Sequence, residues 1–242
     1  MLWVYLSPHL DDAVLSCGGL IWQQTQSGER VEIWTLCAGD PPNAPLSPFA
    51  ESLHARWQTD LNAPDHRRAE DLTSCALVGA LARHWPLPDC IYRRDAQGRY
   101  LYASEEAIFG PVHPAEEGLI EDLAAQLRRE IPAQAQVIAP LTIGLHADHR
   151  LARAAAQRLQ RSLWYYPDYP YVLSRPEHLG LLLSADWSSQ VFPLSAAAIT
   201  RWAQATAAHV SQISTFWPDQ DAIHPALLGY ATLVGGVRLW RE

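Results

Sequence analysis

Short apolar runs alternate with longer segments of helical periodicity along the first two thirds of the chain. Residues 2–6 form an apolar run that stops at Ser7-Pro8, and residues 13–26 then carry apolar side chains at near-helical spacing. A second apolar run, residues 31–37, ends in a turn sequence rich in Gly and Pro. This part of the chain therefore predicts a β-α-β unit whose strands are largely buried on both faces.

The same alternation continues as far as residue 166. Helices are predicted at residues 65–83, 115–130 and 150–160, and strands at residues 89–92, 137–140 and 163–166. This order favours an α/β fold, a doubly wound and mostly parallel sheet of Rossmann-like type with helices on both faces. The remainder, with a helix predicted at residues 195–214, contains no linker, so residues 1–242 are predicted to form a single domain.

Composition excludes several classes of protein. The chain has 18 Lys and Arg residues against 26 Asp and Glu residues, a net charge of −8, which has the wrong sign for a nucleic-acid backbone binder. The sequence contains no lysine at all, and this excludes Schiff-base enzymes and P-loop NTPases. We therefore expect neither nucleic acid nor nucleotide-phosphate chemistry.

Cysteine usage and hydropathy indicate the compartment. The four cysteines are scattered without a CxxC pair, as is typical of buried thiols in a reducing environment. No apolar stretch is long enough to span a membrane, and the first residues do not resemble a secretory signal. We expect a cytoplasmic protein with no membrane contact, and its 10 tryptophans leave enough apolar area for a homo-oligomer interface.

Two segments concentrate imidazole and carboxylate groups directly after predicted strands. They are residues 7–12 (SPHLDD) and residues 146–149 (HADH). The carboxyl ends of parallel strands form the edge at which open α/β sheets bind ligands. If the two strands are neighbours, these side chains lie within reach of one divalent cation.

The residue types allow more than one chemistry. Two imidazoles and one carboxylate leave open positions on a cation, which suits a hydrolytic zinc or a non-haem iron centre. The remaining acid and imidazole groups are available for the proton transfers that metal-assisted hydrolysis requires. Each segment alone also has a structural interpretation, because Asp12 can cap a helix and His149 can begin one.

Together the two segments resemble the motifs of the PIG-L/LmbE-like zinc-dependent N-deacetylases. The family motif PHxDD is matched by residues 8–12, and HxDH by residues 146–149. The resemblance implies that zinc is bound by His9, Asp12 and His149. It also implies three catalytic residues, namely a general base, a group that polarises the carbonyl or protonates the amine, and an acid that orients it: Asp11, His146 and Asp148.

Further similarity is looser. Arg67 and Glu70 match the RxxE helix of the family, which implies a place near the sugar, although a charged helix face explains them equally well. Residues 165–171 (YYPDYPY) resemble a family loop whose rings could stack on a pyranose, and Ser211-Gln212 resembles a late SQ pair without an assigned role. Ala13 departs from the family pattern, in which many members carry Glu.

The resemblance implies an amide hydrolase that removes acetyl from an N-acetylglucosamine-like group of a small glycoside. Two other functions remain open, a 2-His-1-carboxylate iron oxygenase and a non-catalytic carbohydrate-binding relative. Preference for the rest of the glycoside is predicted to lie in the loops at residues 40–53, 95–113 and 167–175.

Overall fold

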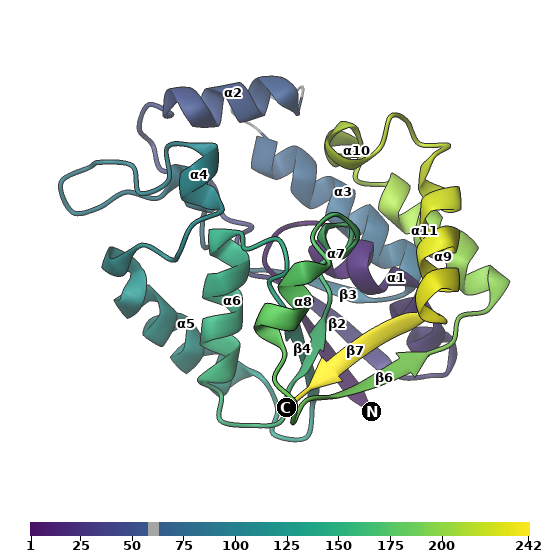
Figure 1. Ribbon diagram of the computed structural model, residues 1–242. Helices are drawn as coiled ribbons and strands as arrows, with labels where there is room; N and C mark the ends of the chain where they lie inside the picture. The colour runs from purple at the N-terminus through teal and green to yellow at the C-terminus, as the bar shows by residue number, and fades with distance from the viewer. Residues whose placement is uncertain (58–62) are drawn as a thin grey trace.

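A seven-stranded sheet with the order β3-β2-β1-β4-β5-β7-β6 forms the centre of the protein. The computed structural model describes residues 1–57 and 63–242 (Figure 1). Five neighbouring strands are parallel: β3 (Leu81–His84), β2 (Arg30–Thr35), β1 (Leu2–Ser7), β4 (Gln136–Pro140) and β5 (Trp164–Tyr166). The predicted α/β fold with a mostly parallel sheet is confirmed.

The far edge of the sheet was not predicted as strands. There β7 (Val237–Arg241) runs antiparallel to β5, and β6 (Ser188–Phe192) runs antiparallel to β7. Because β6 carries more polar and exposed positions than the parallel strands, it lacks the continuous apolar run that identifies a central strand.

Helices cover both faces of the sheet. On one face α1 (Asp12–Gln26), α3 (Ala63–Val78), α9 (Ala196–Ala207) and α11 (Ile223–Val234) pack against one another. On the other, α5 (Glu117–Glu130) packs against α6 (Ala147–Gln157) (Figure 1). Right-handed crossovers explain this division. The chain first adds strands in one direction, from β1 to β3, and then in the other, from β4 to β5, and this reversal places the connecting helices on the opposite face of the sheet.

Shorter elements surround the carboxyl edge of the parallel strands. They are α2 (Pro48–Arg56), the 3₁₀ turns η1 (Cys90–Tyr92) and η2 (Pro114–Glu116), α4 (Glu105–Ile108), α7 (Tyr171–Ser174), α8 (Glu177–Leu182) and α10 (Val210–Phe216). The segments at residues 40–53 and 95–113, predicted as loops, therefore contain helical turns in their second halves.

Three predicted elements are wrong in detail. The helix predicted at residues 65–83 ends at Val78, because Gly79 adopts a left-handed φ of 75°, and the residues beyond it form β3. Residues 89–92 form a 3₁₀ turn capped by Asp89 instead of a strand. The helix predicted at residues 195–214 is two helices that are separated by Ala208 and His209.

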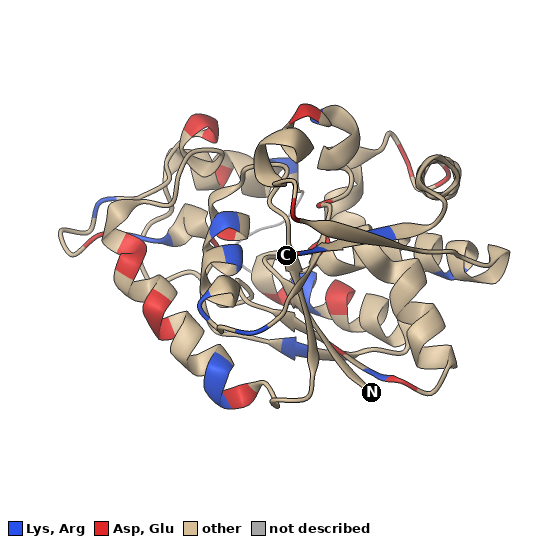
Figure 2. Ribbon diagram, turned by 60° about the horizontal axis from the view of Figure 1, so that its bottom comes forward, with Lys and Arg blue, Asp and Glu red and all other residues tan. Residues whose placement is uncertain are grey.

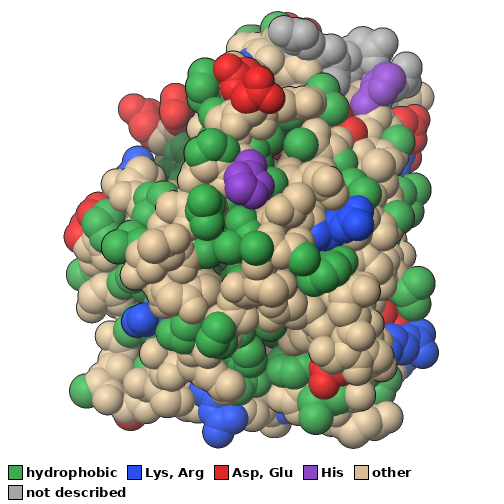
Figure 3. All heavy atoms as spheres, turned by 90° about the vertical axis from the view of Figure 1, so that its right-hand side faces the viewer, with side chains coloured by type: hydrophobic (Ala, Val, Ile, Leu, Met, Phe, Trp, Pro, Cys, Tyr) green, Lys and Arg blue, Asp and Glu red, His purple; other side chains and the backbone are tan. Residues whose placement is uncertain are grey.

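Exposed apolar side chains of the described residues are spread over several elements. Acidic residues stand near the start of α5 and arginines near its end, as the helix dipole favours (Figure 2). All ten tryptophans are buried or half-buried within the protomer, so they do not by themselves indicate an oligomer interface. The large exposed apolar side chains of α11 are Leu228 and Leu233, and apolar atoms are dispersed among polar ones on the face in Figure 3.

No helix in the described parts of the chain combines the length and apolarity needed to cross a bilayer.

Candidate active site

The two predicted chemical segments meet at the topological switch point of the sheet. Strands β1 and β4 are hydrogen-bonded neighbours, with Tyr5 opposite Ile138. The crossovers from these two strands leave toward opposite faces, which opens a crevice at their carboxyl ends. His9 lies just beyond β1, and His149 lies in the first turn of α6 after β4, so both segments border this crevice.

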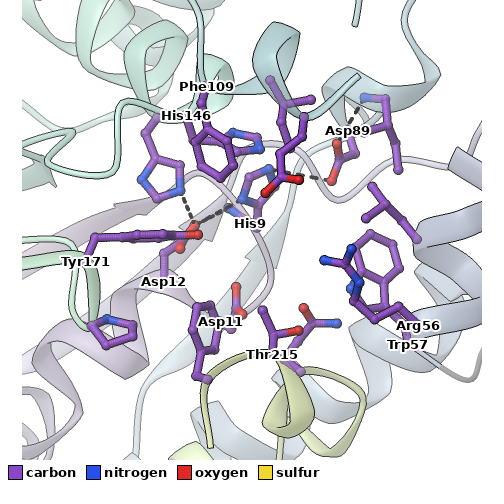
Figure 4. Close-up of a pocket in the computed structure, with 18 of the residues that line it drawn as sticks. His9, Asp11, Asp12, Arg56, Trp57, Asp89, Phe109, His146, Tyr171 and Thr215 are labelled. Atoms are coloured by element: carbon purple, nitrogen blue, oxygen red, sulfur yellow. Dashed lines mark hydrogen bonds and ion pairs between the residues drawn. The ribbon is translucent and has the colours of Figure 1, made fainter. Parts of the chain in front are cut away.

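Two imidazoles face one carboxylate oxygen in the triad His9, Asp12 and His149. Asp12 Oδ2 lies 3.4 Å from His9 Nδ1 and 3.3 Å from His149 Nε2. Two ligands at the usual zinc distances and at a tetrahedral angle are about 3.3 Å apart. Figure 4 shows Asp12 and His9 pointing toward one another at the floor of the pocket. These donors fit a cation such as zinc.

A carboxylate holds each of the two imidazole rings from behind. His9 Nε2 is 2.9 Å from Asp148 Oδ2, and His149 Nδ1 is 2.6 Å from Asp168 Oδ1. A proton on each of these nitrogens leaves the lone pair of the other ring nitrogen directed at Asp12. Such carboxylate–histidine pairs fix the tautomer and the orientation of metal-binding imidazoles.

Asp148 differs from its predicted role as the acid that orients His146. Its carboxylate bonds to His9 and to the backbone N–H of Cys90, and it forms an ion pair with Arg93. The ring of His146 instead accepts a hydrogen bond at Nδ1 from the backbone N–H of Asp148, at 3.2 Å. His146 is the N-cap residue of α6, and Asp148 lies two positions further on. The backbone N–H of Asp148 therefore reaches the ring of His146, while the side chain of Asp148 points toward His9.

The environment of His146 favours the neutral form of its imidazole. Burial and the nearby ring of His9 hold the pKa of His146 well below its usual value, against the opposing effect of Asp148. With Nδ1 accepting a backbone hydrogen bond, the ring proton is placed on Nε2. His146 can therefore polarise a carbonyl as a neutral donor.

Asp11 has a different environment from its neighbour Asp12. Its Oδ1 lies 3.6 Å from the guanidinium of Arg67, and both residues line the same cavity. Burial and the charge of Asp12 raise the pKa of Asp11 to about 6, against the opposing effect of Arg67. A carboxylate with a pKa near neutrality is suited to accept and then return a proton.

Glu70 does not line this cavity. Its two carboxylate oxygens accept hydrogen bonds from the backbone N–H and the hydroxyl of Ser211, at 2.8 and 2.7 Å. Glu70 thereby joins α3 to the first turn of α10. The helix α10 in turn contributes Gln212, Thr215 and Phe216 to the cavity wall, so the SQ pair is part of this anchor.

A cavity of about 580 Å³ lies above the triad. Its floor is polar, and its walls are mainly apolar and aromatic. In Figure 4, Tyr171 stands on one side, Phe109 above, and Arg56 and Trp57 across the opening. All three loop segments predicted to select the substrate contribute to the lining: Phe49, Leu53, Glu105, Ile108, Phe109, Pro170, Tyr171, Leu173 and Ser174.

Sequence reasoning missed two acidic residues of the site. Asp168 was part of the YYPDYPY segment, and it lies two residues beyond β5, the next strand of the sheet after β4. Asp89 lines the cavity with its carboxylate 3.6 Å from His9 Nε2. The position of Asp168 after a predicted strand was a usable signal, whereas Asp89 was assigned to a strand that does not form.

Three other groups of donor side chains in the described residues lie close enough together to hold a cation. The ligand nitrogens of His9, His146 and His149 lie within 4.8 Å of one another, so His146 borders the triad. Two more groups, one with Cys90 and one with Asp89, both depend on Asp148. Since Asp148 Oδ1 lies 2.6 Å from the Arg93 guanidinium, a second cation there would face a buried positive charge.

The fold and the site together define an α/β protein with a histidine- and aspartate-lined cleft at the switch point of its sheet. The comparison with family profiles identifies it further. Residues 4–159 match the PIG-L family, described as GlcNAc-PI de-N-acetylase. The chain belongs to this family.

The individual relatives that the chain resembles are named as deacetylases. The chain is 25% identical to the 2'-N-acetylparomamine deacetylase of Niallia circulans, over 73% of this chain and 70% of that protein. It is 29% identical to the enzyme of the same name from Streptomyces fradiae, over 70% of this chain but only 57% of that protein. The crystal structure of the zinc-inhibited form of teicoplanin deacetylase Orf2 is similar with a TM-score of 0.84 and 27% identity, covering 100% of this chain and 97% of that one.

Proposed function

We propose that the protein is a zinc-dependent N-deacetylase that acts on an N-acetylglucosamine-like group of a small glycoside. The observation that carries this proposal is the convergence of His9 and His149 on one oxygen of Asp12, beside the carboxyl group of Asp11. His9, Asp12 and His149 would hold the zinc. A zinc ion there would supply a Lewis acid that lowers the pKa of water and polarises the amide carbonyl.

The protons of the reaction are assigned to residues beside the triad. Asp11 accepts the proton of the attacking water and passes it to the leaving nitrogen, so that acetate and a primary amine are the products. Since Nδ1 of His146 accepts a backbone hydrogen bond, its Nε2–H is available to donate to the developing oxyanion. This favours carbonyl polarisation over protonation of the amine as the role of His146. Asp148 acts through His9 in this scheme.

The names of the relatives support the substrate class. They include deacetylases of 2'-N-acetylparomamine and a deacetylase solved in complex with teicoplanin. The cavity of about 580 Å³ has room for more than a monosaccharide, and Arg67 and Asp89 are polar lining groups available to sugar hydroxyls.

The two alternative functions have less support. An oxygenase with the same three ligands is not favoured by membership of a de-N-acetylase family. A non-catalytic relative would have no need of Asp11 and His146, the two groups suited to proton transfer and carbonyl polarisation.

The test is a deacetylation assay on the zinc-loaded protein with a panel of N-acetylated glycosides, including 2'-N-acetylparomamine and glycopeptide pseudoaglycones. We expect stoichiometric release of acetate and a primary amine, without oxygen uptake. Turnover that consumes oxygen would support the iron alternative. Binding of the glycosides without acetate release would support the non-catalytic one.

A further inference from the structure

A buried arginine stands behind the carboxylate that holds His9. Arg93 is 7% exposed, and its NH1 group lies 2.6 Å from Asp148 Oδ1. The other oxygen of that carboxylate, Oδ2, bonds to His9 Nε2 and to the backbone N–H of Cys90, each at 2.9 Å. The two oxygens thus have separate partners: Oδ1 forms the ion pair with Arg93, and Oδ2 faces the imidazole.

Arg93 is itself held in place by further buried groups. Its guanidinium bonds to both carboxylate oxygens of Glu116, which is 3% exposed, and NH1 also donates to the carbonyl of Pro88 at 3.1 Å. Glu116 in turn accepts a hydrogen bond of 2.6 Å from the hydroxyl of Tyr102. A row of buried polar groups therefore runs from Tyr102 to His9.

Burial of this row is costly, which argues for a role beyond packing. Two carboxylates and a guanidinium removed from water lose hydration that their mutual attraction only partly restores, and apolar replacements of such buried groups are often as stable. The row also ends on the one ring nitrogen of His9 that points away from Asp12. It lies outside the cavity, because neither Arg93 nor Glu116 lines it.

We propose that Arg93, anchored by Glu116, is a positioning residue that fixes the Asp148 carboxylate and thereby directs Nδ1 of His9 toward the metal. The inference rests on the proposed function, since it assigns His9 as a zinc ligand. Loss of Arg93 leaves the carboxylate held only through Oδ2, so that it fixes the ring of His9 less tightly and Nδ1 presents its lone pair over a wider range of directions.

The test compares variants with the wild type. Zinc affinity is measured by chelator competition on the metal-free protein, and kcat and KM are measured on the zinc-loaded protein. Arg93→Met removes the cation that faces Glu116 and Asp148. It is therefore compared with the double variant Arg93→Met/Glu116→Gln, which also removes the buried charge of Glu116, and folding of each variant is checked by its melting temperature. Arg93→Lys restores the charge without the two-pronged geometry. Arg94→Met is the matched control, because Arg94 contacts Tyr100 and the carbonyl of Pro45 and, among the described residues, is not part of the cavity lining.

We expect about a tenfold loss of zinc affinity in the single and double methionine variants, as for other groups behind metal ligands. Arg93→Lys should recover part of it, and Arg94→Met should bind as wild type. At saturating zinc, kcat should fall in the methionine variants while KM stays unchanged.

Wild-type zinc affinity and kcat in a folded double variant, with a melting temperature close to wild type, would overturn the inference and leave the proposed function intact. A wild-type protein that binds no zinc would overturn both.

Discussion

Two adjacent carboxylates with opposite environments are the central feature at the scale of single residues. Burial opposes ionisation of both, but the two imidazoles beside Asp12 hold its pKa well below the usual value, while Asp11 is raised to about 6. Neighbouring groups whose pKa values are pushed apart are typical of a site in which one binds and the other transfers protons. Asp11 is the N-cap residue of α1 and Asp12 is its first residue, so their side chains point in different directions and meet different partners.

Substitution of each aspartate separates these roles. Asp12→Ala removes the oxygen that both imidazoles face, so the purified variant should contain no stoichiometric zinc by elemental analysis. Asp11→Asn should retain zinc but lose turnover by about a hundredfold or more, because the amide cannot accept the proton. Full activity of Asp11→Asn would exclude it as the base.

At the scale of elements, the cavity wall depends on a contact between two helices. The helix α10 is only 7 residues long, and a helix of this length has little stability of its own. Glu70 of α3 satisfies the backbone N–H of Ser211 in its first turn, where no intrahelical acceptor is available. Glu70 therefore affects the site through the position of Gln212 and Phe216.

Glu70→Ala tests this anchor. The loss of two hydrogen bonds to Ser211 loosens α10, and we expect kcat/KM to fall about tenfold, mainly through a higher KM, with metal content unchanged. Glu70→Gln retains an acceptor for the backbone N–H and should lose less. Steady-state kinetics on both variants provide the measurement, and an unchanged KM in Glu70→Ala would show that α10 is held by other contacts.

At the scale of the whole molecule, a buried histidine makes stability depend on pH. His209 is 1% exposed in the junction between α9 and α10, and neither ring nitrogen has a hydrogen-bond partner in the described parts of the chain. Burial lowers its pKa to about 4, with Arg67 acting in the same direction and Asp71 against it. The folded protein therefore keeps this ring neutral under mildly acidic conditions.

The free energy of unfolding should fall as the pH is lowered from 6.5 toward 4. In this window the unfolded chain takes up a proton on His209 that the folded protein takes up only near pH 4, so the unfolded state is favoured by up to about 3 kcal/mol. Urea unfolding of wild type and His209→Phe at both ends of the window measures this contribution, because other groups titrate in both proteins. Equal losses of stability in the two would contradict it.

Sequence patterns determined the parts of this protein that depend on local interactions. The alternation of buried runs and amphipathic segments predicted the parallel sheet, and the PHxDD and HxDH motifs predicted which strand ends carry His9, Asp12 and His149. The antiparallel pair β6 and β7 was not predicted; in β6 the polar, exposed positions resemble a loop.

The tertiary structure alone decided which side chains pair across long stretches of chain. That Asp148 holds His9 instead of His146, that Asp168 holds His149, and that Glu70 anchors Ser211 each depend on strand order and helix packing. Local spacing determines the face on which a residue lies. The partner that it meets there is decided by which distant segment the folded core brings to that face.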